Sequence, residues 1–496
     1  MRRIRRLLIA NRGEIALRII RTAQAMGLKT VAVYSAADAG AAHVAAADDA
    51  LFVGPAEAAQ SYLNIDSILS AALKCGADAI HPGYGFLSEQ ASFARAVAEA
   101  GLIFVGPPAS VLAVMGDKLA ARKMALEAGV PLVPGAPADS LEAARSLAAG
   151  IGYPLLVKAA AGGGGRGMRL AHSESELELA LEAGSREAKA AFGDGRVYLE
   201  KYLGRPRHIE VQILADQHGN VVALGERECS VQRRHQKLVE ESPSPALDDS
   251  LRLQIVEAAL KLAVRANYVN AGTVEFLLQG RDFYFLEVNA RLQVEHPVTE
   301  MRFGCDLVAE QLKLAMGERL KQHWQPRGHA IECRVYAEDA AADFRPAAGK
   351  VLYFQQPAGP GIRVDTWLAS GSEITSFYDG LMAKVIAWGE DREQARRRIA
   401  RALDEFVLAG VTHTAGFLRD VVLSAAFAAG ELSTRFVAEH FAKWRTAREP
   451  AEIALAAAAL ACQSPSSYAG ASRQDVYRQP ERSPWRELVN FHPWRE

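Results

Sequence analysis

The sequence predicts an α/β N-terminal domain followed by two domains of mixed α and β structure. Short apolar runs alternate with helix-period segments over residues 6–114, the pattern of repeated βαβ units. Further along, alternating strand patterns are mixed with separate helical segments. A chain of 496 residues, half of them hydrophobic, is long enough for about two to four compact units.

The first domain, residues 1–114, has the pattern of a Rossmann-like parallel sheet. Four apolar runs predict strands at residues 7–10, 30–34, 79–81 and 103–106. Three amphipathic segments between them predict helices at residues 14–26, 65–74 and 92–100. The first turn, residues 10–14, lacks the G-x-G-x-x-G fingerprint and its spaced ribose-binding acid. A dinucleotide site is therefore not expected here.

The second domain, residues 115–328, and the third, residues 329–445, are expected to be α+β units. Helices are predicted in the second domain at residues 118–128 and 250–266, among several strands. In the third domain, short strands are predicted at residues 331–336 and 350–354. Helices are predicted after them, at residues 392–405 and 415–423. The tail, residues 446–496, combines an alanine-rich helical segment at 453–461 with an irregular Ser-, Arg-, Gln- and Pro-rich segment at 463–484.

Composition favours a soluble enzyme of the cytoplasm. The 57 basic and 58 acidic residues nearly cancel, so charge favours neither a nucleic acid nor a membrane surface as partner. Five scattered cysteines without C-x-x-C spacing argue against a disulfide framework or a zinc site. The basic start is followed by too short an apolar run for a signal peptide, and no run of about 20 apolar residues predicts a membrane span.

A glycine-rich segment is the first candidate binding element. A strand pattern ends at Lys158, a run of four glycines follows at residues 162–165, and a second strand pattern starts near Met168. Glycines let backbone N–H groups approach an anion closely, and Lys158 can place a positive charge on a phosphate. No G-K-[ST] opens a helix, so this is not a Walker loop. The alternative is a flexible linker.

A polar alternation over residues 283–296 is the second candidate. If this segment is extended, five polar side chains share one face: Glu287, Asn289, Arg291, Gln293 and Glu295. Residues 273–277 alternate in the same way, and a three-residue loop at 280–282 would set Glu275 opposite Glu287. Since a two-residue turn would place them on opposite faces, we predict the longer loop. Facing carboxylates suit Mg²⁺, and a salt-bridged edge strand is the alternative.

Two further motifs are weaker when taken alone. The basic cluster at residues 232–237 could bind an anion or be a solvated charge run. The segment His81-Pro82-Gly83-Tyr84-Gly85-Phe86 marks a turn from a strand into a loop. No H-E-x-x-H and no G-x-S-x-G motif occurs, so neither a zinc protease nor an α/β-hydrolase is favoured.

Read in order, these runs resemble the biotin carboxylase family of ATP-grasp enzymes. The resemblance rests on residues 8–16, 81–89, 115–118, 158–168, 199–203, 232–237 and 291–297. It covers residues 1 to about 445. It implies a Rossmann-like N-terminal domain, an ATP-grasp domain whose lid spans about residues 131–203, and a C-terminal biotin carboxylase domain.

The resemblance implies ATP-dependent carboxylation of biotin by bicarbonate through carboxyphosphate, with Mg²⁺ or Mn²⁺ as cofactor. This is the first half-reaction of a biotin-dependent acyl-CoA carboxylase. The metal ligands would be Glu275, Glu287 and Asn289. ATP would be bound by these two glutamates together with Lys118, Lys158, Gly164, Gly165, Met168, Glu200, Lys201, Leu203, His208 and His235.

The same resemblance assigns the bicarbonate and biotin sites. Bicarbonate would be held by Lys237, Arg291, Gln293 and Val294. Glu295 would remove its proton, and Arg334 would stabilise the enolate-like form of biotin. Tyr84 and Gln232 would shape the biotin pocket. Lys237, Arg291, Glu295 and Arg334 are thus the implied catalytic residues.

No Ala-Met-Lys-Met-like biotinylation motif is present, so biotin is expected on a carrier protein or on a continuation beyond Glu496. The tail resembles the start of the linker domain in acyl-CoA carboxylase α subunits of the methylcrotonyl-, geranyl- or propionyl-CoA type. A carboxyltransferase β subunit would select the acyl-CoA. Gly380, where the family commonly has proline, and Ala25, which is acidic in some dimeric members, leave homo-oligomerisation open.

Two other functions are compatible with parts of the pattern. Another ATP-grasp carboxylate ligase would share the glycine segment and the metal face, but it should lack the biotin pocket at Tyr84 and Arg334. A non-catalytic scaffold subunit would not need the full set of catalytic residues that the resemblance identifies.

Overall fold

The computed structural model describes residues 3–138, 140–160, 168–321 and 323–445. The chain divides into a compact unit, Met1–Trp444, and a second unit, Arg445–Glu496. The architecture below is that of the first unit. The helix and irregular segment predicted in the tail lie outside the described residues.

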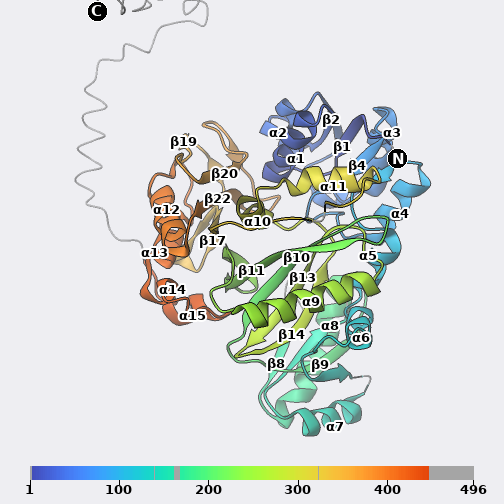
Figure 1. The fold of residues 1–496 in the computed structure, drawn as a ribbon, viewed down its shortest axis with the longest axis vertical. Coiled ribbons are helices and arrows are strands. Elements are labelled where there is room, and N and C mark those ends of the chain that lie inside the picture. The colour runs from blue at the N-terminus through green and yellow to red at the C-terminus, as the bar shows by residue number, and fades with distance from the viewer. Residues whose placement is uncertain (1–2, 139, 161–167, 322, 446–496) are drawn as a thin grey trace, which may run out of the picture. The chain divides into compact units, whose positions relative to one another are not determined.

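The N-terminal domain is built on a parallel sheet, as predicted (Figure 1). The sheet has five strands in the order β3-β2-β1-β4-β5. Its strands are β1 (Arg6–Ile9), β2 (Lys29–Ser35), β3 (Asp49–Gly54), β4 (Ala79–His81) and β5 (Ile103–Phe104). Its helices are α1 (Gly13–Ala25), α2 (Ala42–Ala46), α3 (Ile65–Lys74) and α4 (Ala91–Glu99). The sequence prediction did not include β3, which is the partly exposed edge strand.

Both faces of the parallel sheet are covered, which explains why its strands are nearly continuous apolar runs. Leu7 and Ile9 pack with α1 and with α11 (Leu307–Ala315) on one face. Leu8 points to the other face and packs with α3 and α4. The sheet therefore has two separate cores.

An eight-stranded sheet runs through both of the following domains, in the order β14-β13-β10-β11-β12-β15-β22-β20. Its strands are β10 (Arg207–Ala215), β11 (Val221–Arg233), β12 (Gln236–Ser242), β13 (Asn270–Gln279), β14 (Asp282–Asn289), β15 (His329–Tyr336), β20 (Ile362–Thr366) and β22 (Leu381–Gly389). Since β12 pairs with β15, the boundary predicted at residues 328 and 329 falls between neighbouring strands of one sheet.

Helices cover this sheet at both ends. Apolar side chains of α5 (Ala109–Gly116), α6 (Lys118–Glu127) and α9 (Asp249–Arg265) share a core with β10, β13 and β14. At the other end, α12 (Arg392–Asp404) and α13 (Ala415–Leu423) share a core with β15 and β22. The remaining elements there are α14 (Ala425–Ala428), α15 (Phe436–His440), β16 (Glu338–Asp339), β17 (Arg345–Pro346), β18 (Gly349–Lys350), β19 (Tyr353–Gln355), β21 (Glu373–Ile374) and β23 (Val407–Ala409).

The segment predicted as a lid has its own sheet and core. Its strands are β6 (Gly135–Pro137), β7 (Leu155–Ala159), β8 (Arg169–Ala171) and β9 (Val197–Lys201), and its helices are α7 (Leu141–Ile151) and α8 (Glu174–Phe192). Strands β7 and β8 pair in antiparallel fashion, so the glycine segment joins two strands, as predicted. Gly164 and Gly165 themselves lie outside the described residues.

The β13–β14 hairpin places Glu275 opposite Glu287, as predicted, but the predicted three-residue loop is wrong. Gly280 and Arg281 form a two-residue turn between paired strand ends. The register then shifts by one residue at a β-bulge that includes Leu286. A bulge adds one residue to one strand, so the side chains beyond it point to the other face of the sheet. Glu275 and Glu287 therefore share a face, which a two-residue turn alone would not give.

The prediction of an extended segment through residue 295 is also wrong. Strand β14 ends at Asn289, residues 290–295 form a loop, and α10 (His296–Phe303) begins immediately afterwards. Pro297 occupies the first turn of α10, where its missing N–H costs nothing. Similarly, the strand predicted at residues 350–354 is divided into β18 and β19, which belong to separate small sheets.

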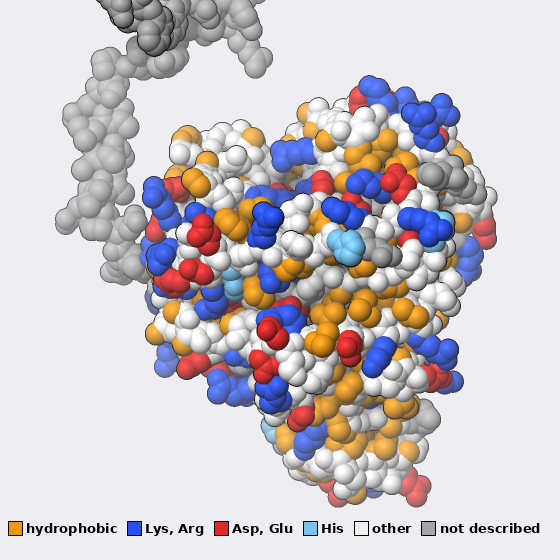
Figure 2. Space-filling model, in the orientation of Figure 1, with side chains coloured by type: hydrophobic (Ala, Val, Ile, Leu, Met, Phe, Trp, Pro, Cys, Tyr) orange, Lys and Arg blue, Asp and Glu red, His pale blue; other side chains and the backbone are white. Residues whose placement is uncertain are grey.

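On the face drawn in Figure 2, Lys and Arg side chains are interspersed with Asp and Glu, and no broad area carries one sign. No helix among the described residues has the length and apolar character needed to cross a membrane.

Candidate active site

A pocket of about 1070 Å³ is lined by residues from all three predicted domains. Among the predicted site residues it is lined by Tyr84, Lys118, Lys158, Met168, Glu200, Lys201, Leu203, His208, Gln232, His235, Lys237, Glu275, Glu287, Asn289, Arg291, Gln293, Val294 and Arg334. Glu295 is fully buried immediately behind this lining, in contact with Lys237 and Arg334. The structure thus brings together every predicted site residue that it describes.

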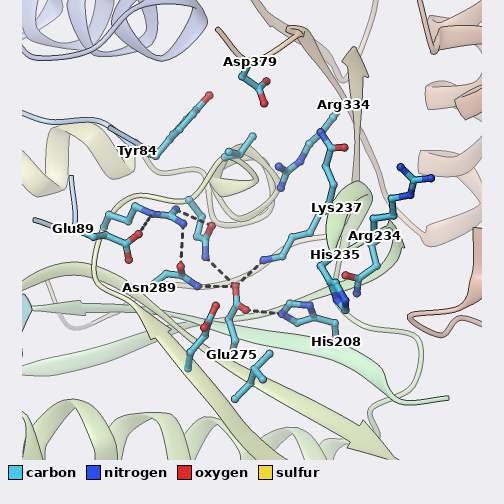
Figure 3. Close-up of a pocket in the computed structure, with 18 of the residues that line it drawn as sticks. Tyr84, Glu89, His208, Arg234, His235, Lys237, Glu275, Asn289, Arg334 and Asp379 are labelled. Carbon is cyan, nitrogen blue, oxygen red and sulfur yellow. Dashed lines mark hydrogen bonds and ion pairs between the residues drawn. The ribbon is translucent and has the colours of Figure 1, made fainter. Parts of the chain in front are cut away.

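Lys237 contacts three buried carboxylates, of which Glu275 is drawn in Figure 3. Its Nζ lies 2.6 Å from Glu210, 2.8 Å from Glu275 and 2.7 Å from Glu295. Burial opposes the charge of Lys237, but these three carboxylates outweigh it and hold its pKa well above the ordinary value. Lys237 is therefore a permanent cation that faces the pocket.

Glu295 immediately precedes α10 and contacts Lys237 and Arg334. One carboxylate oxygen accepts from Lys237 at 2.7 Å, and the other accepts from Arg334 Nη2 at 2.9 Å. Burial favours the neutral acid, but Lys237, Arg334 and Arg227 outweigh it and hold the pKa of Glu295 well below its usual range. The carboxylate is ionised at neutral pH and can accept a proton.

Glu275 and Glu287 meet across the hairpin beside Asn289. Glu275 already accepts from Lys237 and His208 and from the amide of Asn289, the last two at 2.9 and 2.8 Å. Lys118 Nζ lies 3.5 Å from Glu287. Burial raises the pKa of Glu275, but Lys237 and His208 outweigh it and keep the carboxylate ionised. These oxygen donors fit a divalent cation such as Mg²⁺, which takes few protein carboxylates and completes its shell with phosphate and water.

Arg291 is fixed by a chain of hydrogen bonds in the loop at residues 290–295. Its guanidinium donates to Glu89 at 2.8 Å, to the side-chain oxygen of Asn289 at 2.9 Å and to that of Gln293 at 3.1 Å. Gln293 donates in turn to Glu275 at 3.1 Å. The loop therefore converges on the same carboxylate as the strands, although it is not extended.

Arg334 and Tyr84 line the opposite wall of the pocket. Arg334 Nε donates to Glu240 at 2.5 Å, in addition to its bond with Glu295. The hydroxyl of Tyr84 donates to Glu14, and burial together with that carboxylate holds the pKa of Tyr84 well above its usual value. Tyr84 is thus a neutral phenol at any ordinary pH.

The end of the pocket at which ATP is predicted to bind is formed by the predicted lid and the adjoining strands. Lys158 and Arg122 both pair with Glu200. Lys201 directs its amino group to the backbone carbonyls of Gly152 and Tyr153 at 3.0 and 3.1 Å. In His235, burial lowers the pKa, and Lys158 adds to the effect.

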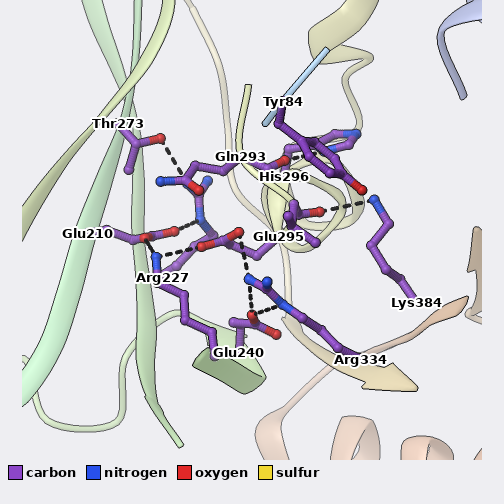
Figure 4. A network of polar contacts seen from close by, with 12 residues as sticks. Tyr84, Glu210, Arg227, Glu240, Thr273, Gln293, Glu295, His296, Arg334 and Lys384 are labelled. Atoms are coloured by element: carbon purple, nitrogen blue, oxygen red, sulfur yellow. Dashed lines mark hydrogen bonds and ion pairs between the residues drawn. The ribbon is translucent and has the colours of Figure 1, made fainter. Parts of the chain in front are cut away.

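Several buried residues of the network were not predicted from the sequence. Arg227 is fully buried, pairs with Glu210 and donates to Gln212, Thr299 and Thr273 at 2.8, 2.8 and 3.1 Å (Figure 4). Lys384 is also fully buried and donates to the backbone carbonyl of Val294 at 3.0 Å. Glu14, Glu210 and Glu240 are further buried members of this network, and Glu89, which contacts Arg291, is an exposed one. The alternation Ile209-Glu210-Val211-Gln212-Ile213 was the one available signal, since it places polar groups at regular positions of an otherwise apolar strand.

Three domain families match the chain in succession. The N-terminal domain of biotin carboxylase matches residues 3–112, the ATP-binding domain of the carbamoyl-phosphate synthase L chain matches 117–323, and the C-terminal domain of biotin carboxylase matches 332–439.

Curated relatives align with most of the chain. A biotin carboxylase of Nostoc sp. is 51% identical over 440 residues, which are 88% of this chain and 98% of that protein. The mitochondrial methylcrotonoyl-CoA carboxylase subunit alpha of Dictyostelium discoideum is 44% identical over 498 residues, covering 98% of this chain and 70% of that protein.

Solved structures of similar proteins superpose closely. A biotin carboxylase from Campylobacter jejuni in complex with β,γ-ATP has a TM-score of 0.87 at 44% identity and covers 88% of this chain and 99% of that one. The biotin carboxylase domain of 2-oxoglutarate carboxylase from Hydrogenobacter thermophilus, with MgADP, ADP and bicarbonate, has a TM-score of 0.87 at 43% identity, covering 90% and 100%.

Proposed function

The chain belongs to the biotin carboxylase family, and from that premise we propose how its residues carry out the ATP-dependent carboxylation of biotin. The observation that supports the proposal best is the position of Glu295 between Lys237 and Arg334. The same carboxylate therefore contacts Lys237, the cation proposed to bind bicarbonate, and Arg334, the cation proposed to act on biotin.

In the first step, bicarbonate binds to Lys237, Arg291, Gln293 and the backbone of Val294. Glu295 accepts its proton, and the resulting oxyanion attacks the γ-phosphorus of ATP. The bond between the γ-phosphorus and the β-γ bridging oxygen breaks, giving carboxyphosphate and ADP. Because an anion attacks an anion, positive groups must neutralise both reactants, as Lys237 and Arg291 do here.

Glu275, Glu287 and Asn289 would hold the divalent cations. When bound, these ions would neutralise phosphate charge on ATP. Lys118 and Lys158 would contact phosphate oxygens from two sides of the pocket, Lys118 from α6 and Lys158 from β7. Glu200, Lys201, Leu203 and Met168 would line the adenine end, with His208 and His235 nearby.

In the second step, carboxyphosphate breaks down to CO₂ and phosphate beside biotin. The phosphate takes the proton from N1 of biotin while Arg334 stabilises the negative charge on the ureido oxygen. N1 then attacks CO₂, giving carboxybiotin. Tyr84 and Gln232 would bound the biotin pocket. Closure of the lid, about residues 131–203, would exclude water, because carboxyphosphate hydrolyses readily when water reaches it.

Biotin would arrive on a carrier domain or protein, and a carboxyltransferase β subunit would transfer the carboxyl group to an acyl-CoA. The methylcrotonoyl-CoA carboxylase relative, which aligns over nearly the whole chain, supports the acyl-CoA carboxylase assignment.

The test is ADP release by the purified chain with Mg²⁺ and bicarbonate, with and without free biotin. We expect biotin to stimulate ADP release and carboxybiotin to form. Turnover that requires bicarbonate but does not respond to biotin would instead indicate another ATP-grasp ligase. Unchanged turnover in Lys237→Ala and Glu295→Ala would refute the residue roles.

A further inference from the structure

The residues behind Arg334 form two charged rows across the central sheet. In one row, Arg334 on β15 lies opposite Lys384 on β22, which lies opposite Asp365 on β20. Directly paired residues point to the same face of a sheet. The row therefore places a carboxylate next to Lys384, whose Nζ lies 3.8 Å from Asp365 and 3.2 Å from Glu14.

The neighbouring row carries a different arrangement of charge. Glu240 on β12 lies opposite Glu332 on β15, and Glu332 lies opposite Ile386 on β22. Arg363 on β20 follows, but Ile386 separates it from Glu332. Arg363 is instead paired with Asp365 and with Glu300, each at 2.7 Å.

Glu332 is consequently a buried carboxyl group without a partner. Its exposed fraction is 0%, and neither of its oxygens has a hydrogen-bond partner among the described residues. No cation of the described chain lies within ion-pair distance of it. Its cross-strand neighbour Glu240 is also 0% exposed and contacts Arg334 through one oxygen, while its other oxygen has no partner.

Two adjacent carboxylates in this environment cannot both remain ionised at low cost. An isolated buried charge costs several kcal/mol, and like charges directly opposite each other on neighbouring strands repel. Burial raises the pKa of Glu332 well above its usual value, and Glu240 adds to this, whereas Lys384 opposes it only partly. Burial raises the pKa of Glu240 to about 7, although Arg334 opposes it.

We propose that Glu332 is a positioning residue for the second step: it is held as a neutral carboxylic acid beside Glu240, and its neutrality leaves the guanidinium of Arg334 to Glu240 and Glu295. The role of Arg334 in the second step rests on the proposed function. Glu332 and Arg334 are two residues apart on β15 and share a face, so an ionised Glu332 would compete for the same guanidinium.

The charged and titratable groups that face Glu332 account for its state. They are Glu240 from β12, Arg334 from its own strand, Lys384 from β22, Asp365 and Arg363 from β20, Glu14 from α1, and Glu295, His296 and Glu300 from the start of α10. Each cation in this group is already in contact with at least one other carboxylate. Deprotonation of Glu332 would therefore add a charge that the site does not balance.

The direct test is infrared difference spectroscopy of the full chain at neutral pH, comparing wild type with Glu332→Gln. We expect the wild type to show a protonated-carboxyl C=O band that shifts in D₂O and that is reduced in the variant. Glu373→Gln, at an exposed glutamate, is the matched control and should leave the band unchanged. An unchanged band in Glu332→Gln would overturn the proposal. This readout does not depend on turnover, so it remains decisive if biotin carboxylation fails.

The kinetic test is the pH profile of biotin-dependent turnover. Ionisation of Glu332 should contribute to the decline of wild-type turnover at alkaline pH, by at most about tenfold per pH unit for one proton. In Glu332→Gln this decline of turnover should move to higher pH. Superimposable profiles would overturn the proposed role of neutrality. Because Glu332 is proposed to be neutral and has no hydrogen-bond partner among the described residues, an apolar side chain should replace it, and Glu332→Leu should also fold. Failure of both Glu332→Gln and Glu332→Leu to fold would contradict the proposal.

Discussion

Replacement of Glu295 by glutamine is the most informative single change, because it removes the proposed base and keeps the side-chain shape. Glu295 is fully buried and accepts from Lys237 at 2.7 Å and from Arg334 at 2.9 Å. In the variant, Lys237 retains Glu210 and Glu275, and Arg334 retains Glu240. Neither cation is left unpaired, so the pocket should keep its form.

The expected loss is that of a general base. Such a group contributes about 10²–10⁴-fold, equivalent to about 3–5 kcal/mol of activation free energy. We therefore expect bicarbonate-dependent ADP release by Glu295→Gln to fall by that factor, in kcat more than in the KM for ATP. Binding of MgADP, followed by calorimetry, should be unchanged, and Glu373→Gln provides a mutational control at an exposed position.

The same substitution has a pH signature in stability. The pKa of Glu295 is lower in the folded state than its ordinary value of 4.5, so at pH values above 4.5 the charged carboxylate stabilises the folded protein. This stabilisation is lost as the pH falls toward the pKa of the folded state. Denaturation of the wild type below pH 4.5 should therefore be steeper than that of Glu295→Gln. Full activity in Glu295→Gln, with carboxybiotin still formed, would refute the assignment of Glu295 as the base.

Three further predictions test the surrounding network. Lys384→Met removes the contact with the Val294 carbonyl, so the KM for bicarbonate should rise while the KM for ATP does not; equal changes in both would contradict this role. Arg227→Met leaves the fully buried Glu210 with one cation, Lys237, and should lower the free energy of unfolding by about 3–5 kcal/mol. An unchanged midpoint of urea denaturation would contradict this prediction. Glu287→Gln should raise the Mg²⁺ concentration needed for half-maximal turnover, and an unaltered Mg²⁺ titration would argue against Glu287 as a ligand.

The sequence predicted the parallel sheet and helices such as α1, α9 and α12, because their patterns depend on local periodicity, but it did not predict α7 or α8. It did not predict how Glu275 comes to face Glu287. A two-residue turn alone would place these glutamates on opposite faces, and the β-bulge at Leu286, which brings them to one face, leaves no mark in the hydrophobic pattern. The correct pairing was therefore predicted from an incorrect loop.

The loop at residues 290–295 illustrates a second limit. Its alternating polar residues resemble a strand, yet Arg291 and Gln293 reach the site from irregular backbone that leads into α10. Alternation reports which side chains share an environment, but not whether a strand or a loop brings them there. The buried residues Arg227, Glu240 and Lys384 were missed for another reason, because each pairs with a residue on another element. Arg227 and Glu240 stand beside other charged residues, as on a solvent-exposed segment, and Lys384 is the single charged residue of an apolar strand.

The continuous central sheet explains why two chemically different steps can share one carboxylate. Lys237 and Arg334 lie on β12 and β15, which are paired neighbours, and both contact Glu295. Their separation is therefore fixed by the hydrogen bonds of a sheet rather than by the docking of two domains. By contrast, Lys158 belongs to the separate sheet of the lid segment. In the proposed mechanism, movement of this segment would complete the ATP site without changing the distance between the proposed bicarbonate and biotin cations. That distance must remain small if CO₂ is a short-lived intermediate.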